Sequence, residues 1–307
     1  MPLLHPAKEK RSKAKAVRNV MTSPSELISQ SSNSLASLLA DAIEQNQLEV
    51  PMLPTVATRV ITLTQDPDTD ARHLSDLIQG DQSLAAYVMK IANSPAYTPD
   101  GNLVSLQQAI ARLGMKNIAE IAITASVNSK TFAVPEFESE ISLLWDHSLA
   151  TALWSKEIAR ICRKNVECVF LCGLLHSIGK PAALQKVVEL ANRHQIPTEP
   201  DLCMKLVDQF HRKIGIEVVQ KWAMPKAVVD VLSNFDDYRN SEHSMEPTAI
   251  VVTGSAFATY MLQPELISEK ALVEMESLEI INLYDDEVEA LLDKYCDIRS
   301  SMETMRS

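Results

Sequence analysis

Residues 73–97 read HLSDLIQGDQSLAAYVMKIANSPAY, a stretch that divides into two amphipathic helices joined by a tight corner. The first apolar series stops at Gly80, and glycine commonly ends helices. Asp81 follows at once, and its carboxylate can accept backbone N–H groups at the start of a second helix. Turn residues, Ser94 and Pro95, close the stretch. The apolar faces at helical spacing are Leu74, Leu77 and Ile78, then Leu84, Val88 and Ile91.

Composition extends this helical interpretation to the whole chain of 307 residues. Only 7 residues are glycine, far below the usual share of about 7%, and sheets with tight hairpins need more. We predict an all-α, two-lobed, multi-helix fold with lobes at about 48–133 and 134–262. The first helix is expected to follow Ser34. A basic and then Ser-rich disordered tail at 1–33 and an acidic helical extension at 263–307 are predicted to flank residues 34–262.

Charge and cysteine content restrict the class of protein. The net charge of −11 argues against non-specific nucleic-acid binding. No apolar run approaches the roughly 20 residues of a membrane span, and no secretory signal opens the chain, so we expect a cytoplasmic protein. The five scattered cysteines fit a reducing compartment. Cys168 and Cys172 share a helix face, either as buried apolar residues or as a zinc pair. A basic cluster, interpreted as a solvated terminus or as a contact for an anionic partner or membrane, comprises Lys8, Lys10, Arg11, Lys13, Lys15 and Arg18.

Three histidines lie in apolar helical stretches: His147, His176 and His211. Histidine is costly to bury unless it is hydrogen-bonded or coordinated. Gly173 precedes His176 by three residues and Gly215 follows His211 by four, so each glycine shares a helix face with its histidine. Two interpretations remain open at this point. The glycines either allow close helix approach around a histidine cluster, or they serve tight packing beside three hydrogen-bonded core histidines.

The chain resembles the HDOD domain, a branch of the HD superfamily, over about residues 48–262. Residues 73–97, the following helix VSLQQAIARLG at 104–114 and the entry motif PMLP at 51–54 match the first half of the family pattern. The second half agrees at CGLLHSIGK (172–180) and KWAMP (221–225). The single positions that carry the resemblance are Asp81, Leu84, Asn93, Ser94, Ser105, Ala109, Ile110, Leu113, Gly114, Trp145, His147, Ser148, His211 and Gly215.

In active HD-superfamily enzymes, an adjacent His-Asp pair and further histidines bind one or two divalent metals that activate water against a phosphoester. The resemblance places the first histidine at His147 and another at His211. The pair falls on His176-Ser177, so serine replaces the aspartate, and a later His-His pair falls on Phe235-Asp236. A neutral hydroxyl is a poor ligand for a hard cation, and phenylalanine cannot ligate.

What remains for a metal is at most three imidazoles, with Asp146, Asp236 or Asp237 as substitute ligands. A three-histidine site could hold a single zinc-like ion. Lys180 matches a lysine that is placed to meet phosphate in active relatives, or it complements a helix C-terminus. We therefore expect no cofactor, with a single divalent metal as the alternative, and no catalytic residue beyond the motif remnants His176, Ser177 and Lys180.

The resemblance implies a bacterial regulatory module in signal transduction that is catalytically inactive and binds a protein partner or a nucleotide-like ligand. The alternative is a metal-dependent phosphohydrolase with an atypical site. A third interpretation places function in the cleft between the two lobes. The identity of the ligand or partner, the pathway and the oligomeric state stay open.

Overall fold

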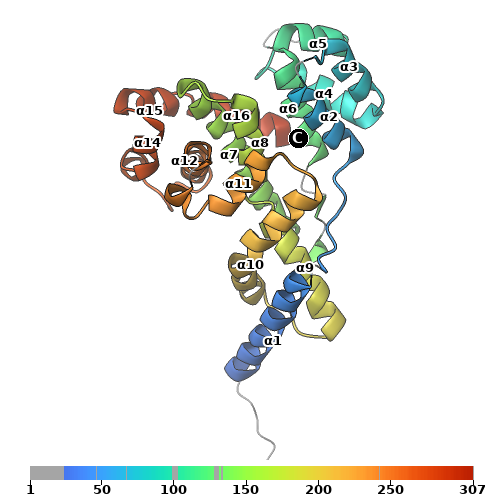
Figure 1. The fold of residues 1–307 in the computed structure, drawn as a ribbon, viewed down its shortest axis with the longest axis vertical. Helices are drawn as coiled ribbons and strands as arrows, with labels where there is room; N and C mark the ends of the chain where they lie inside the picture. The colour runs from blue at the N-terminus through green and yellow to red at the C-terminus, as the bar shows by residue number, and fades with distance from the viewer. Residues whose placement is uncertain are drawn as a thin grey trace, which may run out of the picture.

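The computed structural model describes residues 24–306 except 46, 67, 99–102, 128–130, 133 and 242. The described residues form helices without a strand, and the helices gather into two lobes (Figure 1), which confirms the predicted fold class. The basic cluster within the predicted tail lies outside the described residues.

The first lobe is a bundle of five short helices, α2 to α6. Asp70 and Asp81 accept backbone N–H groups at the starts of α3 and α4, which confirms the prediction made for Asp81. Asn93 ends α4, and its side-chain amide pairs with both backbone groups of Leu103, at 2.8 and 2.9 Å. This pairing fixes the corner after α4. The bounds are α2 Thr55–Gln65, α3 Ala71–Gln79, α4 Gln82–Ala92, α5 Leu106–Leu113 and α6 Met115–Ser126.

The second lobe is built on α7, which packs against both α8 and α12, while α9 packs along α10. Pro200 lies in the first turn of α10, and Pro225 immediately precedes α11 as its N-cap. The segment 200–221 is a single helix. The bounds are α7 Glu138–Ile161, α8 Val166–Leu175, α9 Gly179–His194, α10 Pro200–Lys221, α11 Lys226–Asn234 and α12 Met245–Leu262, with short 3-10 turns at Pro135–Phe137 and Tyr238–Asn240.

Helix α1 spans Pro24–Glu44 and packs on α9 and α10, so it belongs to the second lobe although it precedes the first in the chain (Figure 1). It begins at Pro24, eleven residues before the predicted start after Ser34, which corrects the prediction of disorder for 24–33. The polar, Ser-rich composition there concealed a helix that is continued by an apolar face at Leu35 and Leu39. An extended segment then leads to α2, and Trp222 Nε1 donates to its Pro51 carbonyl at 2.7 Å.

The predicted extension after residue 262 forms four helices, and the last of them reaches the junction between the lobes. Helix α16 packs against α7 of the second lobe and α6 of the first. The bounds are α13 Glu269–Val273, α14 Glu276–Ile281, α15 Asp285–Leu292 and α16 Tyr295–Arg306.

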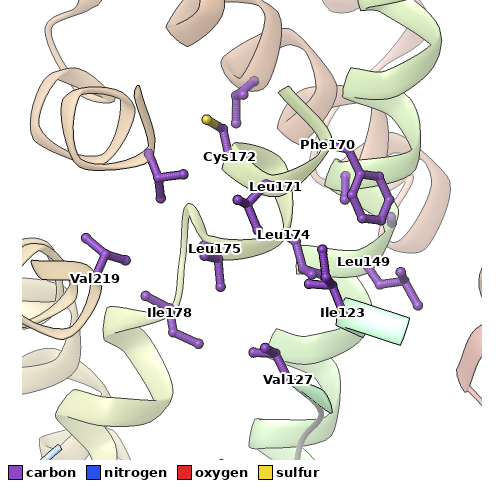
Figure 2. Packing of buried hydrophobic residues seen from close by; sticks show 14 of the residues in the cluster. Ile123, Val127, Leu149, Phe170, Leu171, Cys172, Leu174, Leu175, Ile178 and Val219 are labelled. Atoms are coloured by element: carbon purple, nitrogen blue, oxygen red, sulfur yellow. The ribbon is translucent and has the colours of Figure 1, made fainter. Parts of the chain in front are cut away.

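The core runs continuously through both lobes, and α8 lies at its centre (Figure 2). Every residue of α8 from Val169 to Leu175 is buried. A Cβ atom on Gly173 would lie 2.8 Å from Ala152 Cα, so glycine lets α8 approach the α7 backbone closely. The stretch Val166–His194 is long and apolar enough to cross a membrane by length and composition, yet 72% of its most apolar window is buried inside the fold, as in a core helix.

Candidate functional site

The structure brings two of the three predicted histidines together. His147 lies in the middle of α7, and His176 follows the last residue of α8. Their ring centroids are 5.7 Å apart, with the planes tilted by 49°. His211 lies on α10, and its backbone carbonyl faces Gly179, where α9 begins. The three histidines predicted as candidate ligands therefore lie around one region of the second lobe.

Hydrogen bonds fix the protonated nitrogen of each histidine. His176 Nδ1 lies 2.7 Å from the Gly173 carbonyl, and a carbonyl only accepts, so Nδ1 carries the proton. His211 Nδ1 likewise faces the Val207 and Asp208 carbonyls. The remaining nitrogen, Nε2, is left with a lone pair in both rings.

His147 has the opposite tautomer. Its Nε2 lies 3.0 Å from Thr259 Oγ1, and that hydroxyl already donates its proton to the Ser255 carbonyl. Thr259 therefore accepts, and His147 Nε2 donates, which leaves the lone pair on Nδ1. Backbone and hydroxyl partners thus hydrogen-bond all three histidines, in keeping with one of the two interpretations that the sequence leaves open.

Burial lowers the pKa of all three imidazoles, which favours their neutral form. Burial lowers the pKa of His147 to about 4, and the positive charge of Lys180 adds to the effect. Burial also lowers the pKa of His176 well below its ordinary value, with nearby His147 as the next cause. The pKa of His211 falls because of burial and the charges of Arg212 and Lys180. Neutral imidazole can ligate a metal or accept a proton, but it contributes no charge.

A pH dependence of stability follows from His147. The pKa of His147 in the folded state lies below the ordinary 6.5. The stability that the neutral imidazole contributes is therefore fully present above pH 6.5 and is lost as the pH falls towards 4. Allowing for partial exposure, we expect about 2 kcal/mol of the free energy of unfolding to be lost over that window because of His147 alone. His147→Gln, which keeps a donor for Thr259, should flatten this slope in urea titrations at pH 4.5 and 7. An unchanged slope in the variant would contradict the assignment.

Ser177 takes part in a hydroxyl pair. Ser148 donates to the Leu144 carbonyl at 2.9 Å, so Ser177 donates to Ser148 across 2.6 Å. Both side chains line a small, mostly apolar pocket with Trp145 and Leu174. The serine at the position expected for an aspartate is therefore part of the contact between α7 and the turn after α8.

Phe235 covers His176. The two rings are stacked with centroids 5.2 Å apart and planes 24° from parallel. The Arg212 guanidinium lies 4.6 Å from the centroid of the Phe235 ring. The sequence showed that Phe235 cannot ligate, and the structure adds that its ring fills the space beside a candidate ligand.

Two of the three substitute carboxylates, Asp236 and Asp146, are paired with arginines. Asp236 receives Arg212 Nε at 3.0 Å and Arg212 Nη2 at 2.8 Å, while Arg212 Nη1 reaches the His176 carbonyl at 3.2 Å. Asp146 is buried, and its Oδ2 lies 3.1 Å from Arg306 Nη2. Burial raises the pKa of Asp146, and the charge of Arg306 opposes that rise. The third candidate, Asp237, accepts from the Asn240 amide.

The donor set does not fit a two-metal phosphoesterase centre. Such a centre needs carboxylates facing the imidazoles, and here the candidate carboxylates have other partners. In the part of the chain that the structure describes, no three His, Cys, Asp or Glu side chains gather in a way that could hold a metal ion. The pair Cys168 and Cys172 is therefore not part of such a cluster, and Cys172 is buried.

Lys180 is not at a helix C-terminus, which corrects one of the two roles predicted for it. It is the second residue of α9, directly after Gly179. The positive end of the helix dipole disfavours a cation there. Helix α8 stops at Leu175 and a turn intervenes before α9, so Lys180 lies at the start of a helix and not at the end of one.

Two arginines with central roles were not identified from the sequence. Arg212 joins Phe235, Asp236 and the His176 backbone, and Arg306 pairs with Asp146. The only signal for Arg212 was its position next to His211. Nothing in the sequence linked Arg306 to Asp146, because 160 positions separate them and the fold alone makes them neighbours.

Comparison with known proteins identifies the family. The profile of the HDOD domain matches residues 50–238, more than half of the chain. The chain belongs to the HDOD family. A relative in Treponema pallidum (strain Nichols), an uncharacterized protein, is 22% identical over 238 residues, which are 75% of this HDOD chain and 44% of the relative. The chain thus spans less than half the length of that relative.

Crystal structures share the HDOD fold. An "HDOD domain protein with unknown function" from Geobacter sulfurreducens matches with a TM-score of 0.69 and 22% identity, over 89% of this chain and 98% of its own. A "Putative metal-dependent phosphohydrolase" from Shewanella amazonensis SB2B matches at 0.67 and 20%, over 89% and 99%. A "Putative signal transduction protein" from Marinobacter aquaeolei VT8 matches at 0.62 and 19%, over 90% and 66%.

Proposed function

We propose that this HDOD protein is a catalytically inactive regulatory module of bacterial signal transduction. It acts by binding a protein partner or a small nucleotide-like ligand. One observation carries the proposal: the Phe235 ring is stacked on His176 at 5.2 Å while Arg212 holds Asp236. At positions where a phosphohydrolase needs metal ligands, this chain has a phenylalanine ring and a carboxylate that is already paired with an arginine.

The charges around the histidines favour a ligand that carries phosphate. Lys180 and Arg212 are cations close enough to depress the histidine pKa values. Lys180 also lies in the first turn of α9, so its positive charge adds to the positive end of the helix dipole. An anion at this place would relieve that repulsion. A nucleotide phosphate has the required charge without needing a metal.

The alternative function is a metal-dependent phosphohydrolase with an atypical site. His147 and His176 lie 5.7 Å apart and each has a nitrogen lone pair, which favours this alternative. Two similar structures carry signal-transduction or phosphohydrolase names, so both functions need to be tested on this chain. We also propose a cytoplasmic protein without nucleic-acid affinity, in keeping with the charge of −11.

A phosphoesterase screen separates the two functions. The full chain is assayed with Mn²⁺, Ni²⁺ and Mg²⁺ against bis(p-nitrophenyl) phosphate, nucleoside triphosphates and cyclic dinucleotides, beside His176→Ala. We expect both proteins to show the same background rate, because the carboxylates that would hold the metal are absent or already paired. Turnover by the wild type that is lost in His176→Ala would refute the proposal. The thermal shifts that the same nucleotides cause in the wild type and in Lys180→Ala report binding without hydrolysis.

A further inference from the structure

A cavity of about 540 Å³ lies between α1 and α9, which pack side by side (Figure 1). This volume is typical of pockets that hold small ligands. One side of the cavity comes from the end of α1 and residues 47–49, and the other side comes from the second half of α9. Lys221 Nζ donates to the Leu48 carbonyl at 2.6 Å and so fixes part of the first side. None of the three histidines of the candidate site lines this cavity.

The first side carries two carboxylates, those of Asp41 and Glu49, and both residues are exposed. Asp41 lies in the last turn of α1, which ends at Glu44, so the negative end of the helix dipole adds to its charge. Among the residues that the structure describes, neither carboxylate takes part in an ion pair. This side of the cavity therefore favours positively charged groups.

The α9 side carries two cations that share one carboxylate. Lys186 Nζ lies 3.2 Å from each oxygen of Glu189, and Arg193 Nη2 donates to one of these oxygens at 2.7 Å. The side chain of Lys186 is 7% exposed, whereas that of Arg193 is 59% exposed. One carboxylate neutralises only one of the two positive charges. Within the described ranges Arg193 uses Nη2 alone, so its other nitrogens are free to bind a second carboxylate.

The opposite charges of the two sides do not meet. In the part of the chain that the structure describes, no ion pair joins Asp41 or Glu49 to Lys186 or Arg193 across the cavity. Leucine side chains add apolar surface between the charged groups. The cavity thus offers two carboxylates, one guanidinium with unused donors and a short apolar surface. A ligand with two positive groups, one carboxylate and an aliphatic chain complements all three features.

We propose that the cavity between α1 and α9 binds a free basic amino acid of the lysine, ornithine or arginine type. The carboxylate of the ligand binds Arg193, and its two positive groups bind Asp41 and Glu49. Its aliphatic chain lies against Leu48 and Leu190. A diamine lacks the carboxylate for Arg193, and a neutral amino acid lacks the second positive group. Because the histidine site takes no part, this inference and the proposed function can fail independently.

Calorimetric titration of the full chain with three probes tests the proposal. The probes are L-lysine, cadaverine, which lacks the carboxylate, and L-norleucine, which lacks the side-chain ammonium. We expect L-lysine to bind about tenfold more tightly than either of the other two, because each of them loses one charged contact. Equal affinity for L-lysine and cadaverine, or for L-lysine and L-norleucine, would overturn the proposal. So would the absence of binding by both L-lysine and L-arginine.

Two exposed substitutions assign the contacts. Arg193→Gln should weaken L-lysine binding about tenfold and leave cadaverine binding unchanged, whereas Asp41→Asn should weaken the binding of both. Arg299→Gln breaks a similar exposed i,i+4 pair, with Glu303 on α16, and should change neither. An equal loss of L-lysine binding in Arg193→Gln and Arg299→Gln would contradict the assignment.

Hydrogen exchange locates the ligand. Saturating L-lysine should slow the exchange of amides at 47–49 and 186–194 and leave those around His147 and His176 unchanged. Protection confined to the histidine region would overturn the proposal, because the ligand would then occupy the other site.

Discussion

Lys156→Met is expected to destabilise the protein by about 3–5 kcal/mol, the largest effect of any single side-chain replacement on a charged residue here. The Lys156 ammonium contacts the Glu120 carboxylate across the contact between α6 and α7 and donates to Asn117 Oδ1 at 2.8 Å. The two charged side chains are 8% and 6% exposed. Burial already raises the pKa of Glu120 although Lys156 opposes the rise. Without Lys156, Glu120 is left buried and uncompensated.

Urea unfolding at pH 7 measures this loss, and two variants serve as controls. Lys156→Met/Glu120→Leu removes both charges and should recover most of the lost stability, because a buried ion pair can often be exchanged for apolar groups at little cost. Lys270→Met breaks an exposed pair with Glu274, where the side chains are 80% and 62% exposed, and should change stability by less than about 0.5 kcal/mol. Equal effects of Lys156→Met and Lys270→Met would show that the buried pair has no special role.

Gly179→Ala is expected to be comparably damaging, by about 3 kcal/mol or more, because it forces apart two backbones. A Cβ on Gly179 would overlap the His211 carbonyl oxygen and would lie 2.7 Å from Gly215 N. Both obstacles are backbone atoms of α10, which no rotamer change can move. The variant should therefore separate α9 from α10 and displace His211, Lys180 and Phe235 relative to one another.

Thermal unfolding checks the magnitude, with Gly80→Ala as the matched control. Gly80 has an ordinary helical φ of −63° at the exposed end of α3, and a Cβ there meets Leu77 O at 3.3 Å. Its replacement should leave the melting temperature nearly unchanged, whereas Gly179→Ala should lower it by more than about 6 °C. A Gly179→Ala protein as stable as Gly80→Ala would mean that the two helices do not meet as closely as described.

Local signals predicted the helices well because each depends on neighbours in the chain. Asp70, Asp81 and Ser105 accept backbone N–H groups at the starts of α3, α4 and α5. The close packing expected at Gly173 and Gly215 is also present, with Ala152 and Gly179 as the respective partners. Helix α1 begins earlier than the sequence predicts because its first eleven residues lack a strong apolar period.

The contacts that decide the site could not be predicted, because they join distant positions. The sequence identified His176, Ser177 and Phe235 as departures from the enzyme pattern but not what each contacts. Ser177 pairs with Ser148 on another helix, and the Phe235 ring contacts both His176 and Arg212. Asp146 and Asp236 looked like available ligands because their arginine partners lie 160 and 24 positions away.

The metal content of the purified protein tests the central claim most directly. The full chain is saturated with Mn²⁺, Ni²⁺ or Zn²⁺, desalted, and measured by inductively coupled plasma mass spectrometry beside His176→Ala treated in the same way. Because Phe235 covers His176 and Arg212 holds Asp236, we predict that both proteins retain far less than one ion per chain, and equally little. One ion per chain in the wild type, lost in His176→Ala, would contradict the account.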